Sequence, residues 1–434
     1  MNGRGLLRTL FPALLGGVGL AIAAAALLSA FTATNAPLML LASTAPAQTG
    51  DFTLRLRPVR VLIHSDAECV WIGAEHEIIV RDERGRALAT LPPDRRPLRA
   101  GSGSGDPFRF GTNSFAATEL LLTESGDGPL TVSENGTDAA RSERRFAGTL
   151  RVRRRGDDHL DVVNEVDIEP YVASVVASEV WPTFDPEAVR AQAIAARTYV
   201  VYQMMRREQH PFDVATTQGS QVYRGVRDDD IGRRAADAAR YTRGVLCTYG
   251  DSGTQRVFCA YYGAACGGLS QPAAIFGADG DIAPLAGGVT CDYCKIAPAD
   301  VYRWGPVRLS KEELSRRLGA KYPEVAALDG IRRLDVIERT PTGRPTMLRL
   351  LGRDGRTYDL LAERFRHAVG PTEIRSTDFQ LRDQGSDVVF DHGRGFGHGL
   401  GLCQWGSQGQ ARVGRHACDI LRHYYPGAKL TKGY

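Results

Sequence analysis

Several features that would define other protein classes are missing from this chain of 434 residues. Cysteine occurs only 8 times, far below the density of a disulfide-held scaffold. The formal net charge is only +4, which gives no basis for a nucleic-acid binder held by a basic surface field. The motifs HExxH, GxxxxGK[ST] and GxSxG are absent, so zinc proteases, P-loop NTPases and α/β-hydrolases are excluded on their signatures.

The composition that remains is that of a globular protein. Hydrophobic residues make up 43% and charged residues 24% of the chain, which excludes wholesale disorder. The length is sufficient for two or three packed units, since domains usually contain ~100–200 residues. Strand-like and helix-like patterns are mixed without a regular βαβ alternation, and we therefore predict an α+β fold.

The N-terminal segment carries the longest apolar run. Between Arg8 and Asp51 there is no charged residue, and Leu10–Phe31 consists almost entirely of Leu, Ala, Gly, Val, Ile and Phe. At 1.5 Å per residue this run is long enough to cross a ~30 Å hydrocarbon core. We predict a single-pass anchor in the cytoplasmic membrane with the bulk of the chain extracytoplasmic. The alternative is a cleaved signal peptide, for which Ala45-Pro46-Ala47 offers a loose cleavage motif.

Three regions follow from these patterns. Residues 1–50 form the cytoplasmic stub and the anchor or signal peptide, and residues 51–157 form a β-rich region with strands such as Val59–Ile63. Residues 158–434 contain every candidate for chemistry. In that last region we predict helices over 170–181, 186–207 and 228–243, the second of them opened by Asp185-Pro186-Glu187.

Glu179 is the first candidate catalytic residue. It follows Val172, Val175 and Val176 at helical spacing, so a carboxyl group shares a face with an apolar stripe. Loss of hydration raises the pKa of such a carboxyl group and lets it hold a proton near neutral pH, as a general acid requires. The alternative from pattern alone is a structural ion pair, for instance between Glu179 and Arg197.

The residues around Glu179 resemble the signature of the SpoIID/LytB family of sporulation proteins and amidase enhancers. The resemblance rests on the stretches 171–182 and 187–199, on Gln-Val-Tyr-Arg-Gly at 221–225, on Cys-Gly-Gly at 266–268, and on the block 397–406. The segment 421–427 also fits, and the weaker likeness extends from about residue 59 to the C-terminus. The family implies an extracytoplasmic domain at 158–434 that remodels peptidoglycan.

By that resemblance the expected activity is lytic transglycosylation of glycan strands stripped of their stem peptides. Glu179 matches the catalytic acid and base, and no nucleotide or organic cofactor is implied. Arg197, Tyr199 and Gln221 match positions that bind the substrate. The rival reading is a non-catalytic glycan-binding module that stimulates a partner cell-wall amidase. Neither reading involves a nucleic acid, and the membrane is contacted only through the N-terminal helix.

The segment 393–404 is the most glycine-dense in the chain. Its spacing does not fit the GxGxxG dinucleotide fingerprint, and no strand-loop-long-helix unit follows it. A tight packed turn and a close approach to a sugar are both compatible with these glycines. The family resemblance favours the sugar, with His398 and Gln404 as further substrate-binding residues.

The cysteines allow three interpretations. Cys291 and Cys294 have a metal-ligand spacing, and Cys266 precedes them by 25 residues. Some family members bind zinc through Cys and His, but Gly263 stands here where a histidine is common, so we expect a structural zinc ion bound by Cys266, Cys291, Cys294 and Cys403. In an oxidising compartment, disulfides such as Cys291–Cys294 or Cys247–Cys259 are the alternative. A redox CxxC is the third and least supported interpretation.

Overall fold

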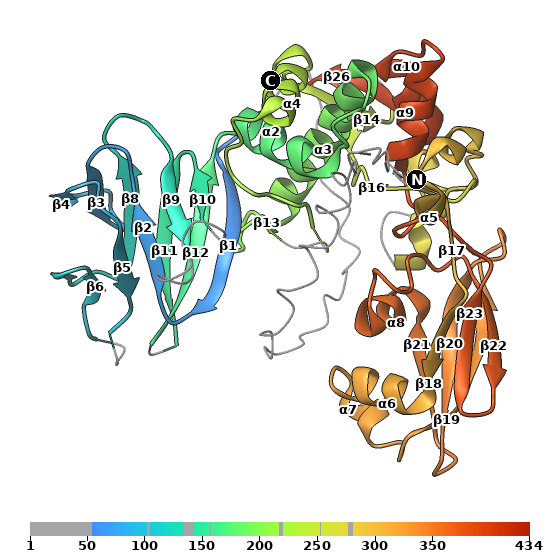
Figure 1. Cartoon of the computed structure of the whole chain (residues 1–434). Coiled ribbons are helices and arrows are strands. Elements are labelled where there is room, and N and C mark those ends of the chain that lie inside the picture. The colour runs from blue at the N-terminus through green and yellow to red at the C-terminus, as the bar shows by residue number, and fades with distance from the viewer. Residues whose placement is uncertain are drawn as a thin grey trace, which may run out of the picture. The chain divides into compact units, whose positions relative to one another are not determined.

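The protein was analysed as a computed structural model, which describes residues 54–101, 105–133, 143–156, 158–216, 220–251, 253–276 and 281–434. The predicted α+β class is confirmed, with two β-sheets in the N-terminal part (Figure 1). The apolar run Leu10–Phe31 lies outside the described residues. Within them, no helix combines the length and the hydropathy needed to cross a bilayer.

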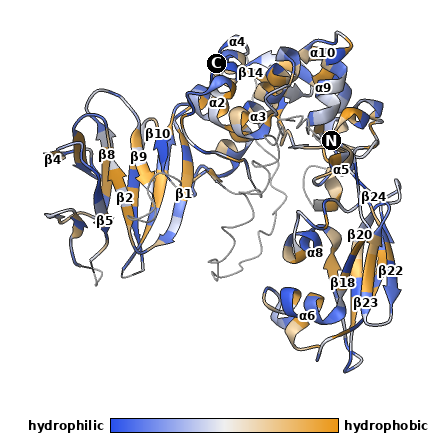
Figure 2. Ribbon diagram, in the orientation of Figure 1, coloured by the Kyte–Doolittle hydropathy of each residue, from blue (hydrophilic) through white to orange (hydrophobic). Residues whose placement is uncertain are grey.

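Two sheets make up the N-terminal part of the described chain. A seven-stranded sheet has the order β13 (Val214–Ala215), β1 (Val59–Ala67), β12 (His159–Val166), β11 (Thr149–Arg155), β8 (Glu119–Glu124), β3 (Ile78–Asp82) and β4 (Ala87–Leu91). A six-stranded sheet has the order β10 (Arg144–Phe146), β9 (Leu130–Ser133), β2 (Val70–Gly73), β5 (Arg96–Arg99), β6 (Phe108–Phe110) and β7 (Asn113–Phe115). Buried residues of both sheets belong to one hydrophobic cluster, and Figure 2 shows apolar residues along their strands.

Three helices continue from the seven-stranded sheet. β12 ends at Val166, and α2 (Ile168–Glu179) begins after a single residue. Val180 is extended (φ −97°, ψ 152°), so Glu179 is the last residue of α2. α3 (Pro186–Arg206) has Pro186 in its first turn, as predicted from the sequence, and α4 (Asp230–Tyr241) is capped by the Asp229 side chain.

Short elements at residues 245–296 and 402–432 follow these helices in the chain, and α9, α10 and β14 pack against α3. A three-stranded sheet joins β15 (Arg256–Val257), β14 (Val245–Tyr249) and β26 (Lys429–Lys432), and a parallel pair joins β16 (Tyr262–Gly263) to β25 (Leu402–Cys403). The helices are η1 (Ala273–Phe276), η2 (Ala283–Leu285), η3 (Asp292–Ile296), α9 (Gln404–Arg412) and α10 (Ala417–Tyr424). The sequence pattern over 256–262 predicts a single strand, and this prediction is wrong, because the two ends of the segment pair with different partners.

Residues 299–394 form a segment with its own hydrophobic cluster, which contains Leu314, Leu334, Phe365 and Phe390. Its helices are α5 (Ala299–Tyr302), α6 (Lys311–Gly319), α7 (Pro323–Ala326) and α8 (Ala362–Val369). Its strands are β17 (Arg303–Trp304), β18 (Val307–Ser310), β19 (Ile331–Arg339), β20 (Pro345–Gly352), β21 (Thr357–Leu361), β22 (Gln380–Gln384), β23 (Asp387–Asp391) and β24 (Gly393–Arg394). We call 295–402 the insertion, because the four clustered cysteines all lie outside it.

Candidate active site and cysteine cluster

Glu179 lies at the end of α2 with a hydrogen-bond donor at each carboxyl oxygen, and we call these residues the Glu179 site. Its Oε1 accepts the Val222 N–H at 3.2 Å, and its Oε2 accepts the Gln404 side-chain amide at 3.2 Å. Glu179 is only partly exposed as a residue, while the stripe formed by Val172, Val175 and Val176 is fully buried. The helix α2 therefore has the predicted apolar stripe, with a carboxyl group at its end.

Burial raises the pKa of Glu179 above its ordinary value, because the charged form loses hydration. The two hydrogen bonds from Val222 and Gln404 and the positive charge of Arg224 act in the opposite direction. The carboxyl group of Glu179 is therefore able to hold a proton at a higher pH than a solvated glutamate. After the proton has left, the two hydrogen-bond donors stabilise the carboxylate.

The amide of Gln221 holds the segment that touches Glu179. Tyr171 Oη donates to Gln221 Oε1 at 2.8 Å, and Gln221 Nε2 donates to Tyr262 Oη at 2.8 Å and to the Ala196 carbonyl at 3.3 Å. Gln221 is 1% exposed, so its side chain is committed to protein partners. In the structure Gln221 therefore supports Val222 from the protein interior. The sequence had predicted that Gln221 contacts the substrate.

Tyr199 and His398 belong to an aromatic group next to that support. The Tyr199 ring lies 6.5 Å from Tyr262 and 6.3 Å from Tyr261, and the His398 ring lies 6.0 Å from Tyr261. Burial lowers the pKa of His398 to about 4, so its imidazole is neutral at pH 7. His398 is partly exposed and Tyr199 is buried. No sequence motif singles out Tyr262, which joins this group to Gln221 through a hydrogen bond.

Arg197 has a different role from the predicted one. Its side chain has no exposed surface, and its Nη2 and Nε bind the two carboxylate oxygens of Glu169 at 2.6 Å and 3.1 Å. Burial alone would raise the pKa of Glu169, but the hydrogen bonds and charge of Arg197 bring it below its ordinary value. Arg197 therefore joins α2 to α3, and the alternative pairing of Arg197 with Glu179 does not occur.

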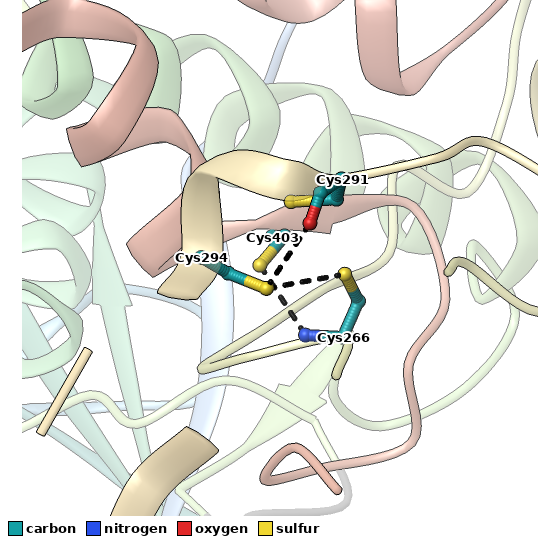
Figure 3. A group of neighbouring side chains, drawn as sticks. All are labelled: Cys266, Cys291, Cys294 and Cys403. Carbon is teal, nitrogen blue, oxygen red and sulfur yellow. Dashed lines mark hydrogen bonds between the residues drawn. The ribbon is translucent and has the colours of Figure 1, made fainter. Parts of the chain in front are cut away.

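Four cysteines converge beside this site. Cys266, Cys291, Cys294 and Cys403 are all buried, and their sulfur atoms lie within 4.8 Å of one another (Figure 3). The Cys266 and Cys294 sulfurs are 3.8 Å apart. Tetrahedral coordination at a Zn–S distance of ~2.3 Å requires an S···S edge of ~3.8 Å, so this spacing fits a zinc ion. The cluster could hold a metal ion such as zinc.

Hydrogen bonds to the sulfurs favour thiolates in this cluster. The backbone N–H groups of Cys266 and Gly406 each lie 3.3 Å from Cys403 Sγ, at the start of α9. Tyr424 Oη lies 3.0 Å from Cys291 Sγ. A Cβ on Gly406 would lie 1.9 Å from that hydroxyl and 2.6 Å from Cys291 Sγ. Glycine at this position is what allows α9 to approach the cluster.

The disulfide alternative finds no counterpart here, since none of the eight cysteines forms a disulfide bond. The 3.8 Å between the Cys266 and Cys294 sulfurs is far longer than a disulfide bond of ~2.05 Å. Cys247 lies on β14, and Cys259 follows β15. In this pair of strands, Thr248 and not Cys247 is the residue opposite Val257. Cys69 and Cys418 are only partly buried and lie outside the cluster.

The insertion contacts the segment that carries Cys266. Arg344, between β19 and β20, is 2% exposed and donates to the carbonyl groups of Cys266 and Leu269. Thr342 Oγ1 donates to Gln271 Oε1 at 3.1 Å. The insertion therefore touches the cysteine cluster both at its ends, next to Cys294 and Cys403, and at the tip of this hairpin.

Two family models match parts of this chain. The family described as "Stage II sporulation protein" (SpoIID) matches residues 156–249, which include Glu179. A domain of unknown function, DUF8618, matches residues 294–401, close to the limits of the insertion.

Three relatives add to these matches. An uncharacterized protein of Brachyspira hyodysenteriae is 32% identical over 278 residues, 63% of this chain and 69% of the relative. Stage II sporulation protein D of Bacillus subtilis is 28% identical over 283 residues, 62% of this chain and 76% of the relative. The amidase enhancer of Bacillus subtilis is 33% identical over 75 residues, 17% of this chain and 10% of the relative. The fold and the site define an α+β protein in which a glutamate at the end of a helix lies beside a cysteine cluster. The chain belongs to the SpoIID family.

Proposed function

We propose that this protein is a peptidoglycan lytic transglycosylase with Glu179 as its only acid and base. The observation that carries the proposal is the partly buried carboxyl group whose pKa is raised and whose oxygens both face hydrogen-bond donors. Within the described part of the chain, no second carboxylate hydrogen-bonds or pairs with Glu179. A single carboxyl group suits an intramolecular ring closure better than a hydrolysis that uses a pair of them.

The reaction follows from one proton moving twice. The Glu179 carboxylic acid protonates the oxygen between N-acetylmuramic acid and N-acetylglucosamine, and the bond from that oxygen to C1 breaks as an oxocarbenium-like centre forms. The carboxylate, stabilised by Val222 and Gln404, then removes the proton of the muramoyl C6 hydroxyl. The C6 oxygen attacks C1 and closes a 1,6-anhydro ring, which returns Glu179 to its acid form without consuming water.

Mass spectrometry of the products tests this activity. We expect the full chain, incubated with peptide-stripped glycan strands, to release fragments that end in 1,6-anhydro-N-acetylmuramic acid. These are lighter by one water than the products of hydrolysis. Hydrolytic products alone would rule out the ring closure, and would assign Glu179 to a different glycosidase mechanism.

The second candidate function is a glycan-binding module that stimulates a cell-wall amidase. It is supported by the short match to a relative that is named amidase enhancer. Strands that are bound but not cut, together with faster release of stem peptides when an N-acetylmuramoyl-L-alanine amidase is added, would favour this module over the enzyme.

We further propose that the four cysteines bind one structural zinc ion. Four thiolates would close the coordination sphere and leave no position for water, so the ion would stabilise the fold rather than activate a substrate. Burial raises the pKa of the Cys403 thiol, so a cation is needed before thiolates can accumulate there. The metal would join the segments before and after the insertion.

We also propose that the chain is held in the membrane by its N-terminal segment. The charge-free run from Leu10 to Phe31 supports a single membrane anchor, with residues 51–157 and 158–434 as the two extracytoplasmic regions. Peptide sequencing of the mature N-terminus is the test. A native N-terminus at Met1 in the membrane fraction supports the anchor, and one near Gln48 supports a cleaved signal.

A further inference from the structure

Arg224 places a positive charge next to Glu179. The Val222 N–H binds Glu179 at 3.2 Å, and two residues later the Arg224 N–H binds Ser174 Oγ at 3.3 Å. Both bonds run to α2, so residues 222–224 lie alongside that helix. Gln221 and Tyr223 are buried, whereas Arg224 is exposed. The backbone of Arg224 is thus fixed while its side chain remains in contact with solvent.

The guanidinium of Arg224 differs from those of its neighbours. Arg227 donates to the Ala177 carbonyl and pairs with Asp229, and Arg234 donates to the carbonyl groups of Pro182 and Phe184. For Arg224, no side-chain hydrogen bond or ion pair occurs with any residue that the structure describes. Its charge is nevertheless close enough to Glu179 to lower the pKa of that carboxyl group.

We infer that Arg224 binds the lactyl carboxylate of N-acetylmuramic acid and so selects strands from which the stem peptide has been removed. The inference rests on the proposed function, because it takes the glycan to be bound with its muramoyl unit at Glu179. A stem peptide is joined to the lactyl group by an amide, so its removal exposes one carboxylate per muramoyl unit. A guanidinium binds such a carboxylate with two parallel hydrogen bonds, which a neutral amide oxygen does not match.

Binding at Arg224 also affects the proton on Glu179. While Arg224 is uncompensated, its charge favours the carboxylate form of Glu179. A bound lactyl carboxylate offsets that charge and favours the acid form, which the first chemical step requires. The correct substrate would therefore both occupy the site and help to protonate the catalytic group.

Binding measurements on chains without turnover test the inference. The parent is the full chain with Glu179→Gln, and the variants add Arg224→Gln, Arg224→Lys or Arg412→Gln. Arg412 is an exposed arginine at the far end of α9 from Gln404. The ligands are peptide-stripped strands, the same strands with their lactyl carboxylates converted to methylamides, and chitin oligosaccharides. The dissociation constant of each pair is measured by titration calorimetry.

We expect the parent to bind stripped strands about tenfold more tightly than methylamide strands, the effect of one charge-assisted interaction at a partly exposed site. Arg224→Gln should remove this preference without weakening the binding of methylamide strands or chitin. Arg224→Lys should keep part of the preference, and Arg412→Gln all of it. A preference that persists in Arg224→Gln overturns the inference, as does an equal loss of affinity for all three ligands.

This result is separate from that of the proposed catalysis. If the native chain leaves strands uncut while the parent shows a preference that depends on Arg224, the recognition stands and the transglycosylase does not. If the native chain forms anhydro ends while Arg224→Gln keeps the preference, the catalysis stands and the recognition by Arg224 fails.

Discussion

The Glu179 site and the cysteine cluster are neighbours along one short segment, yet they differ in burial and in the groups that they contain. Cys403 ends β25 and faces the other three sulfurs, and Gln404 begins α9 and donates to Glu179. All four cysteines are buried, whereas Glu179 keeps some exposed surface. A buried set of four thiols suits a structural role, whereas chemistry on a polymer needs a group that the substrate can reach.

Burial acts in the same direction at both sites, because it favours the protonated Glu179 carboxyl group and the protonated Cys403 thiol. Backbone N–H groups favour the anion at both positions. The sites differ in the use of the proton, since the proposed catalysis uses the proton of Glu179, whereas metal binding requires Cys403 to lose its proton. We therefore expect substitutions around Glu179 to change rates and substitutions in the cluster to change stability. The following predictions test that division.

Glu179→Gln should have the largest effect on the rate. The amide keeps the shape of the side chain but cannot protonate the leaving oxygen, so the cleavage rate should fall by about 10²–10⁴-fold. The melting temperature should barely change, because a neutral group on an apolar face costs less than a carboxylate. Glu312→Gln, an exposed position in the first turn of α6, is the control. Cleavage at close to the native rate by Glu179→Gln would remove this residue from catalysis.

Cys294→Ser should affect stability first. We expect it to abolish the binding of one zinc ion per chain and to lower the free energy of unfolding by more than about 4 kcal/mol, as loss of a bound metal does. Metal analysis and denaturant unfolding measure the two effects. Cys69→Ser, outside the cluster, should change neither. Native protein that contains no zinc and has a Cys291–Cys294 disulfide would disprove the metal site.

Stability should depend on pH through Glu179. Its pKa in the folded chain lies above the ordinary value of 4.5 that the unfolded chain has, so between these two values the folded state binds more protons. The free energy of unfolding therefore falls as pH rises through this window, and the loss persists above it. Glu179→Gln lacks this dependence and should become more stable relative to the native chain as pH rises. Parallel unfolding midpoints for the two chains across this window would contradict the raised pKa.

The sequence predicted those parts of the fold and site that depend on local patterns. The start of α3 at Pro186 followed from a capping residue and a proline, and the position of Glu179 followed from helical spacing and a nearby Pro182. The grouping of four cysteines was also predicted, because few residue types bind zinc and Cys291 and Cys294 have a recognisable spacing.

Side-chain partners across the fold could not be predicted in the same way. Arg197 binds Glu169, 28 positions away, instead of Glu179 or a glycan. Gln221 is hydrogen-bonded to Tyr171 and Tyr262. These partners are determined only when α2 and β16 pack together. The separate hydrophobic cluster of the insertion was missed because its members are spread from Trp304 to Phe390 and meet only when the strands and helices between them pack together.

Tyr424→Phe should have the smallest effect, and it probes the boundary between the two sites. The Tyr424 hydroxyl lies 3.0 Å from Cys291 Sγ, and the residue is 1% exposed, so phenylalanine keeps the packing and removes one donor to sulfur. We expect the free energy of unfolding to fall by ~0.5–1.5 kcal/mol. Zinc affinity should fall by ~10-fold, the lower end of the effect of losing a partner of a metal ligand.

The cleavage rate of Tyr424→Phe should remain native, because Gln404 and Val222 still face Glu179. A competition titration with a chromophoric chelator measures the zinc affinity, and Tyr241→Phe, at a position 71% exposed, is the matched control. If Tyr424→Phe instead lost cleavage at unchanged zinc affinity, the hydroxyl group would be acting on Glu179 through α9. The separation of a catalytic Glu179 site from a structural cysteine cluster would then be wrong, because the hydrogen bond between Tyr424 and Cys291 would control the cleavage rate.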